Sequence, residues 1–271
     1  MFNFRAATLF ALLTLPFTPL PVTAQGYETP VTAEILPGWR DESGVHRAAI
    51  RFRLKDGWKT YWRSPGDAGI PPRFTWSGSR NLRSLEVVWP TPEILDQGGM
   101  ISLGYANEVV VPLVIDPKRA GKDIVLQGQL EIGVCKDICI PESIGISARL
   151  PGDATSAETT ISVALNDRPY SAQEAEVSAA TCDVKPSDDG MKITARIHMP
   201  SAGGNEFTVV ETDNPMLWVA EATSQRKGGT LHVSTEVIHV EDQAFLLNRS
   251  GLRFTVLGSD HAVDIQGCSA G

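Results

Sequence analysis

The stretch DIVLQGQLEIGV, residues 123–134, decides the fold class of this chain. Its apolar residues stand at alternating positions and share one face of an extended chain: Ile124, Leu126, Leu130, Ile132 and Val134. The opposite face carries the polar residues Gln127, Gln129 and Glu131. This two-residue period is typical of a β-strand that rests one face on a hydrophobic core.

The same period recurs along the chain, whereas helical periodicity is scarce. It is found in MKITARIHM (191–199), in LRFTV (252–256) and at Ile50, Phe52 and Leu54. Short alternating strands separated by Gly, Pro, Asp and Asn favour antiparallel sheets that pack face to face. We therefore predict an all-β protein built from β-sandwiches.

The N-terminus is predicted to be a cleaved signal peptide covering residues 1–24. A single positive charge at Arg5 precedes the apolar run 6–15, and Val22 and Ala24 stand at the −3 and −1 positions before Gln25. This run is too short to span a bilayer, and no later segment reaches the roughly 18–20 apolar residues of a transmembrane helix. We expect an exported protein without a membrane span.

The remainder of the 271 residues is long enough for two domains. We expect a first sandwich over residues 25–150 and a second over residues 170–271. The segment 151–169 between them is rich in small and polar residues and is expected to be a linker, with a short helix within 156–166. The net charge of −8 argues against nucleic acid or an anionic membrane surface as the ligand.

Two of the four cysteines lie in the segment GVCKDICIPES, residues 133–143. Alternation places Cys135 on the polar face of its strand, and residues 136–138 resemble a turn that leads to Cys139. Such a turn can bring two Cα atoms within the roughly 4.4–6.8 Å of a disulfide. The closed loop is small, so the bridge would add only about 2 kcal/mol of stability. A pair at an exposed turn is accessible to an incoming thiolate, which favours a redox pair.

Two other interpretations of Cys135 and Cys139 stay open at this point. They could form a purely structural bridge, or they could bind a metal, although two cysteines supply only half of a tetrahedral zinc site. A copper(I) site with Met100 is conceivable, because thiolate and thioether sulfur are soft ligands. The redox interpretation requires no cofactor and no metal, since the sulfurs carry the chemistry. The alternative function is a non-catalytic copper-binding or chaperone module.

Cys182 and Cys268 stand near the two ends of the second expected sandwich. An even number of cysteines in an exported chain permits two disulfides, although four cysteines can pair in three ways. Joining the ends of a domain over so long a loop stabilises it by about 4–5 kcal/mol in the chain-entropy model. We expect Cys182 and Cys268 to form a structural disulfide.

A further unusual stretch is GWKTYWRSPGDAGIPP, residues 57–72. Trp58 and Trp62 share strand parity and are expected in a core. Tyr61, Arg63 and Asp67 are candidates for a polar wall around an exposed site.

This stretch, together with VVWPTPEILDQGGMISLGYANEVVVPL (87–113) and LEIGVCKDICIPE (130–142), resembles the periplasmic N-terminal domain of DsbD- and ScsB-type transmembrane thiol-disulfide reductases. The resemblance covers about residues 30–150. It implies an immunoglobulin-like sandwich in the periplasm of a Gram-negative bacterium, with Cys135 and Cys139 cycling between dithiol and disulfide. Electrons would come from a membrane or thioredoxin-like reductase and pass to oxidised periplasmic proteins.

The resemblance also implies roles for individual residues. Cys139 would form the intermolecular bond and Cys135 would resolve it. A loop within residues 94–100 would cap the sulfurs, with Leu95 and Asp96 as the candidate cap residues. The cysteines are closer in sequence than in the best-known DsbD domain, as in ScsB-like members. The sequence also shows neither the transmembrane carrier nor the C-terminal thioredoxin-like domain of the full-length reductases, so we expect separate proteins to supply them.

Overall fold

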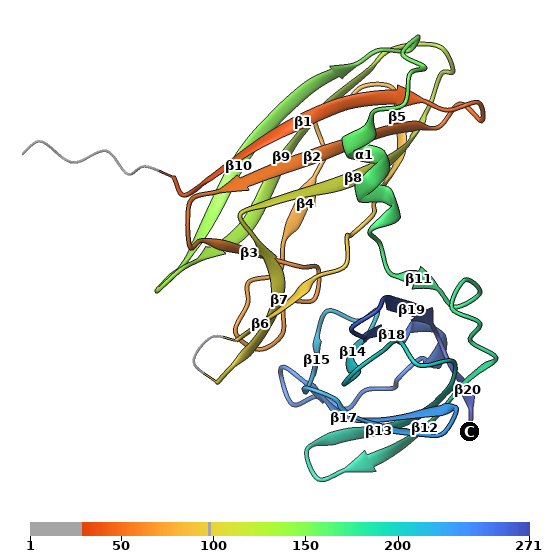
Figure 1. Ribbon diagram of the computed structural model, residues 1–271. Coiled ribbons are helices and arrows are strands. Elements are labelled where there is room, and N and C mark those ends of the chain that lie inside the picture. Colours follow the sequence, from red (N-terminus) through yellow and green to blue (C-terminus); the bar gives the residue numbers. More distant parts are fainter. Residues whose placement is uncertain (1–28, 97–98) are drawn as a thin grey trace, which may run out of the picture.

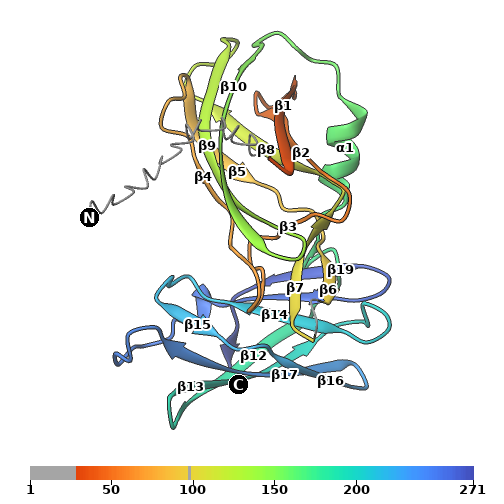
Figure 2. The same ribbon diagram turned by 90° about the vertical axis from the view of Figure 1, so that its left-hand side faces the viewer.

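A computed structural model describes residues 29–96 and 99–271 of the chain. The predicted signal peptide, residues 1–24, lies outside the described residues. The regular secondary structure of the described part is almost entirely strand, and the strands are arranged as two stacked sandwiches (Figures 1 and 2). The predicted all-β, sandwich-like fold is confirmed.

The first sandwich comprises a four-stranded and a six-stranded sheet. The four-stranded sheet has the order β1 (Val31–Arg40), β2 (His46–Leu54), β8 (Glu108–Pro117) and β5 (Leu82–Val87). The other sheet has the order β10 (Cys139–Leu150), β9 (Ile124–Cys135), β3 (Lys59–Tyr61), β7 (Ile101–Ala106) and β6 (Glu93–Asp96), with β4 (Arg73–Thr75) paired to β9. The chain crosses between these sheets at Asn107, whose φ of 61° suits a residue type that tolerates the left-handed region.

The second sandwich follows the same plan. One sheet has the order β11 (Tyr170–Ser171), β19 (Ala262–Gln266), β18 (Arg253–Leu257) and β14 (Phe207–Glu211). The other has the order β15 (Leu217–Val219), β17 (Thr230–His239), β13 (Gly190–His198), β12 (Ala179–Ser187) and β20 (Ser269–Ala270), with β16 (Thr223–Lys227) paired to β17. A short 3-10 helix, η1 (Arg249–Gly251), precedes β18.

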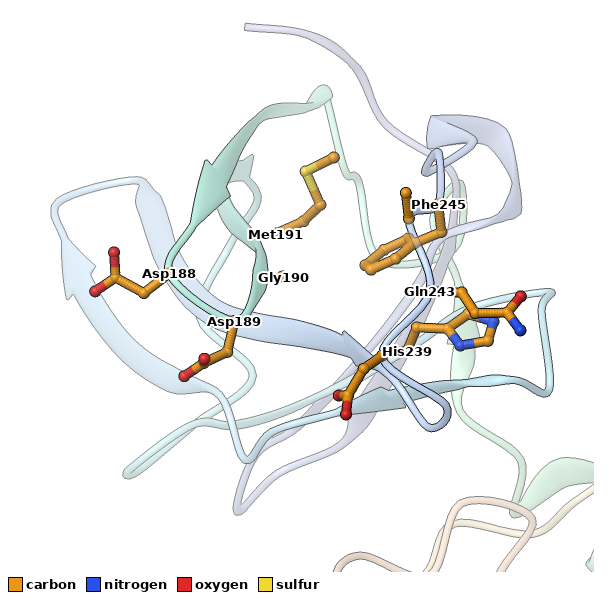
Figure 3. Close-up of a pocket in the computed structure, with 9 residues that line it drawn as sticks. Asp188, Asp189, Gly190, Met191, His239, Gln243 and Phe245 are labelled. Atoms are coloured by element: carbon orange, nitrogen blue, oxygen red, sulfur yellow. The ribbon is translucent and has the colours of Figure 1, made fainter.

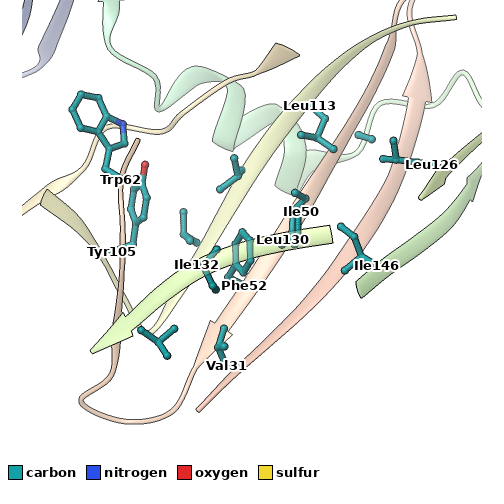
Figure 4. Packing of buried hydrophobic residues seen from close by; sticks show 14 of the residues in the cluster. Val31, Ile50, Phe52, Trp62, Tyr105, Leu113, Leu126, Leu130, Ile132 and Ile146 are labelled. Atoms are coloured by element: carbon teal, nitrogen blue, oxygen red, sulfur yellow. The ribbon is translucent and has the colours of Figure 1, made fainter. Parts of the chain in front are cut away.

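Each sandwich has its own core, and the alternating residues supply it. In β9, the predicted apolar set of Ile124, Leu126, Leu130, Ile132 and Val134 is at most 3% exposed. Figure 4 shows several of these residues with Ile50, Phe52 and Leu113 between the sheets of the first sandwich. The second core likewise contains the inward residues of β13: Ile193, Ala195 and Ile197.

The segment between the sandwiches contains the helix α1 (Thr159–Asn166), within the stretch where a short helix was expected. Its residue Ile161 is fully buried and packs against Leu36 and Ala49 on the outer face of the four-stranded sheet of the first sandwich. Among the described residues, no helix has the length and apolar character needed to cross a membrane.

Candidate redox site

The hairpin of β9 and β10 brings the first two cysteines together. Cys135 and Cys139 are direct partners in the antiparallel register, with their Cα atoms 4.2 Å apart, and their sulfurs form a disulfide. Residues 136–138 close the hairpin, and the Lys136 N–H donates to the Ile138 carbonyl at 3.2 Å. The expected turn is therefore present, and the disulfide lies at the free end of the hairpin.

Strand β3 lies beside the disulfide and contributes Tyr61. Lys59 pairs with Cys135 and Thr60 with Val134, and the Thr60 hydroxyl donates to the Gly133 carbonyl at 2.9 Å. The Tyr61 hydroxyl lies 2.7 Å from Cys135 Sγ and 3.2 Å from Cys139 Sγ. Because neither sulfur of a disulfide carries a proton, the tyrosine is the donor. Tyr61 is thus in direct contact with the expected redox pair.

The two sulfur-bearing residues differ sharply in exposure. Cys139 is exposed, whereas Cys135 is only 1% exposed. Cys135 does lie on the face of β9 opposite the core residues Ile132 and Val134, as the alternation predicts, but that face is covered at Cys135 instead of open to solvent. Gly133 is on the same face of the strand, and the ring of Tyr61 and the side chain of Ile70 cover that face at this point. Of the two cysteines, Cys139 is therefore the one that is open to solvent.

The loop that follows β3 folds back over Tyr61. The Tyr61 hydroxyl is 3.4 Å from the carbonyl oxygen of Ala68, and Gly69 packs against the tyrosine ring. At Gly133 a Cβ atom would lie 2.6 Å from Ile70 Cβ and 3.0 Å from Tyr61 Cδ2. Only glycine allows this close approach of the loop and the ring to β9. The segment 64–70 therefore helps to hold the tyrosine in place.

The neighbouring charges of the hairpin turn are partly engaged elsewhere. The ammonium of Lys136 donates to the Asp56 carbonyl at 3.3 Å, while Asp137 is exposed. Ile138, at the tip of the turn, is 67% exposed beside Cys139.

The remaining wall and cap candidates do not gather at the sulfurs. Asp67 is exposed and lines a small cavity of about 60 Å³ between the sandwiches. Leu95 and Asp96 belong to the strand β6 rather than to a loop, and β6 is separated from β9 by β3 and β7. Ordinary strand spacing puts their backbones roughly 14 Å from β9. Residues 97–98 lie outside the described part, and the capping role stays a prediction.

Cys182 and Cys268 form the second disulfide, as expected, with a Cα–Cα distance of 5.8 Å. Cys182 is fully buried in the second core, and Cys268 packs against that core. This disulfide therefore links the segment between β19 and β20 to β12.

A hollow of about 490 Å³ at one end of the second sandwich offers no comparable chemistry (Figure 3). Asp188 and Asp189 lie on its rim, and the His239 ring nitrogen Nδ1 accepts a hydrogen bond from the Glu241 N–H at 3.2 Å. Within residues 29–96 and 99–271, no group of three or more His, Cys, Asp or Glu is arranged to hold a metal ion.

Comparison with known proteins agrees with this geometry. Residues 30–148 match the family model described as thiol:disulfide interchange protein DsbD, N-terminal. The fold is similar to the crystal structure of the N-terminal periplasmic domain of ScsB from Proteus mirabilis, with a TM-score of 0.65 at 22% identity. That similarity covers 89% of this chain and 92% of the ScsB chain, so it includes both sandwiches. No curated protein sequence matches the chain. Residues 30–148, which contain both sulfurs of the hairpin disulfide, form a DsbD-type N-terminal domain.

Proposed function

We propose that this protein relays electrons in the bacterial periplasm by thiol-disulfide exchange at Cys135 and Cys139. The electrons come from a membrane or thioredoxin-like reductase and pass to oxidised periplasmic proteins. One observation carries the proposal: an accessible Cys139 sulfur is bonded to a buried Cys135 sulfur that accepts a hydrogen bond from Tyr61. We further propose residues 25–150 as the redox domain and residues 170–271 as a separate domain, joined by 151–169.

Reduction proceeds in two exchange steps. A thiolate of the dithiol partner attacks Cys139 Sγ, the Cys135–Cys139 bond breaks, and Cys135 leaves as a thiolate. The Tyr61 hydroxyl donates to this leaving sulfur and stabilises its negative charge. The partner's second thiolate then attacks its own sulfur in the mixed disulfide and releases Cys139. The partner ends as a disulfide, and this protein holds both electrons as a dithiol.

Delivery of the electrons reverses the roles. The exposed Cys139 thiolate attacks a disulfide of the oxidised substrate and forms a mixed disulfide with it. Cys135 then attacks Cys139 Sγ, which restores the hairpin disulfide and releases the substrate as a dithiol. The 4.2 Å Cα separation keeps the resolving sulfur within reach throughout.

Trapping of the mixed disulfide tests the proposal. Cys135→Ser removes the resolving sulfur, and its remaining Cys139 is first activated as a mixed disulfide with a small aromatic thiol. The activated variant is then mixed with a reduced thioredoxin-like protein whose own resolving cysteine is replaced by serine. A covalent complex between the two proteins is expected to accumulate. Cys139→Ser, the matched control, retains only the buried sulfur and is expected to form little complex.

Equal trapping by both variants, or by neither, would contradict the relay. Copper(I) bound at one equivalent to the reduced wild type, with no trapped complex, would favour the copper-binding alternative instead.

A further inference from the structure

Strand β3 leads directly from the disulfide to the contact between the two sandwiches. Its residue Tyr61 contacts both sulfurs, and the next residue, Trp62, is fully buried in the first core. The residue after that, Arg63, extends its side chain into the second sandwich. The sequence suggested Arg63 as part of a polar wall around an exposed site. In the structure its guanidinium instead forms hydrogen bonds with Glu211 and Thr255 of the second sandwich.

The guanidinium of Arg63 is held from several sides. Its Nε and Nη2 atoms donate to the two carboxylate oxygens of Glu211 at 3.1 and 2.9 Å, and Nη2 also donates to the Thr255 hydroxyl at 2.9 Å. Asp264 Oδ1 lies 4.0 Å away, and the guanidinium carbon lies 3.8 Å from the centroid of the Trp62 ring. The Arg63 and Glu211 side chains are only 12% and 19% exposed. A bidentate ion pair with so little exposure fixes the orientation of the Arg63 guanidinium and also balances its charge.

The sheet that receives Arg63 uses both of its faces. Phe254, Val256 and Val263 point into the second core. Val209, Leu257 and Ala262, on the opposite face, join the core of the first sandwich, and Glu211 and Thr255 continue that same face. The two sandwiches are therefore in contact through a packed apolar surface with the Arg63 ion pair beside it. Figure 2 shows β14 and β19 on the side of the second sandwich that faces the first.

The loop after β3 makes a second connection between the same parts. Ser64, Gly66 and Asp67 line the small cavity against β14 and residues 219–222 of the second sandwich. A few residues further on, Gly69 and Ile70 cover Tyr61 and Gly133. The segment 61–70 is thus in contact with the second sandwich in its middle and with the redox site at both ends.

We infer that the second sandwich positions Tyr61 on the disulfide, and that Arg63, held by Glu211 and Thr255, is the positioning residue. This inference rests on the function proposed for Cys135 and Cys139. The reduced sulfur of Cys135 accepts a stronger hydrogen bond than a disulfide sulfur does, because it carries more negative charge. A correctly placed Tyr61 therefore favours the reduced state. Loosening Arg63 shifts the equilibrium of the pair toward the disulfide.

The experiment measures the equilibrium constant for reduction of Cys135–Cys139. The protein is equilibrated in glutathione buffers, or in dithiothreitol buffers for potentials more negative than glutathione reaches, and the alkylated cysteines are then quantified by mass spectrometry. Glu211→Gln is expected to lower this constant about threefold to tenfold, the equivalent of one hydrogen bond. Thr255→Val, which removes one hydroxyl and keeps the shape, is expected to lower it less. The Cys182–Cys268 disulfide of the same molecule is the internal reference.

The matched control is Glu206→Gln. Glu206 and Arg226 form another bidentate pair, with exposed fractions of 3% and 20%, entirely inside the second sandwich. Breaking it is expected to leave the constant for Cys135–Cys139 unchanged. A double variant with Tyr61→Phe tests the route: Glu211→Gln is expected to add no further shift when the hydroxyl is absent.

The inference is overturned if Glu211→Gln and Thr255→Val both keep the wild-type constant, if Glu206→Gln lowers it equally, or if the Tyr61→Phe background retains the full shift. If Glu211→Gln does not fold, Thr255→Val decides. The ratio between variants is measurable whatever the absolute potential of the wild type. A wild-type pair that resists glutathione would contradict the proposed function alone.

Discussion

Replacing Tyr61 by phenylalanine removes one hydroxyl from the redox site and leaves its ring in place. The hydroxyl lies 2.7 Å from Cys135 Sγ, and the residue is 1% exposed, so water does not readily replace the lost donor. A hydrogen bond to a charged group contributes about 1.5–3 kcal/mol, against about 0.5–1.5 kcal/mol for a neutral pair. The reduced state therefore loses about 1–1.5 kcal/mol more than the disulfide state.

For a two-electron couple, about 1.4 kcal/mol corresponds to roughly 30 mV. We therefore expect Tyr61→Phe to make the reduction potential of Cys135–Cys139 more negative by about 20–30 mV. The assay is titration in glutathione or dithiothreitol redox buffers, with each cysteine read by alkylation and mass spectrometry.

Tyr105→Phe is the matched control. Tyr105 is 5% exposed and pairs with Thr60 on the adjacent strand, but its hydroxyl donates to the Pro90 carbonyl at 2.8 Å and not to a sulfur. We expect it to leave the potential unchanged. The reasoning is refuted if Tyr61→Phe has the wild-type potential, or if both variants shift it equally.

Three further predictions concern stability and access. Replacing both Cys182 and Cys268 by alanine removes a disulfide that spans a sequence separation of 86. We expect the free energy of unfolding, measured with urea, to fall by about 4–5 kcal/mol. An unchanged urea midpoint would contradict this. Burial lowers the pKa of His46 below its usual 6.5, so protons bind more readily to the unfolded chain. We therefore expect stability to fall as pH drops below about 6.5, and His46→Gln to lose this part of the pH dependence in unfolding titrations from pH 7.5 to 5. A methyl group at Gly133 would overlap Ile70, so Gly133→Ala is expected to displace the loop that covers Tyr61. We expect the free energy of unfolding to fall by about 1–3 kcal/mol and the disulfide to be reduced faster by small thiols. Wild-type stability together with a wild-type reduction rate would refute the overlap.

The elements that the sequence predicts well are those specified by local pattern. The alternation in residues 123–134 gives the buried and exposed faces of β9 because side chains of a strand alternate strictly. The tripeptide between Cys135 and Cys139 gives the hairpin, since its length and the extended residues on both sides leave few other arrangements. The second disulfide follows from two cysteines near the ends of one domain.

Local pattern fails where the environment comes from distant residues. Cys135 is buried because Tyr61, 74 residues earlier, covers its face of the sheet, and alternation cannot show what lies above a strand. Arg63 pairs with Glu211 across 148 residues. The sequence therefore indicates that Arg63 is polar, but it does not identify the residue that binds it. Leu95 and Asp96 were expected in a loop because the family resemblance implies a capping loop there, yet pairing with β7 makes them a strand.

The central claim is that Cys135–Cys139 is an exchange pair while Cys182–Cys268 is a structural bridge. One glutathione titration of the wild-type protein, with all four cysteines read separately, tests it most directly. The account predicts that Cys135–Cys139 is reduced at a potential above about −300 mV, the range of labile and catalytic disulfides, while Cys182–Cys268 stays oxidised. Equal resistance of both disulfides, or prior reduction of Cys182–Cys268, would contradict it.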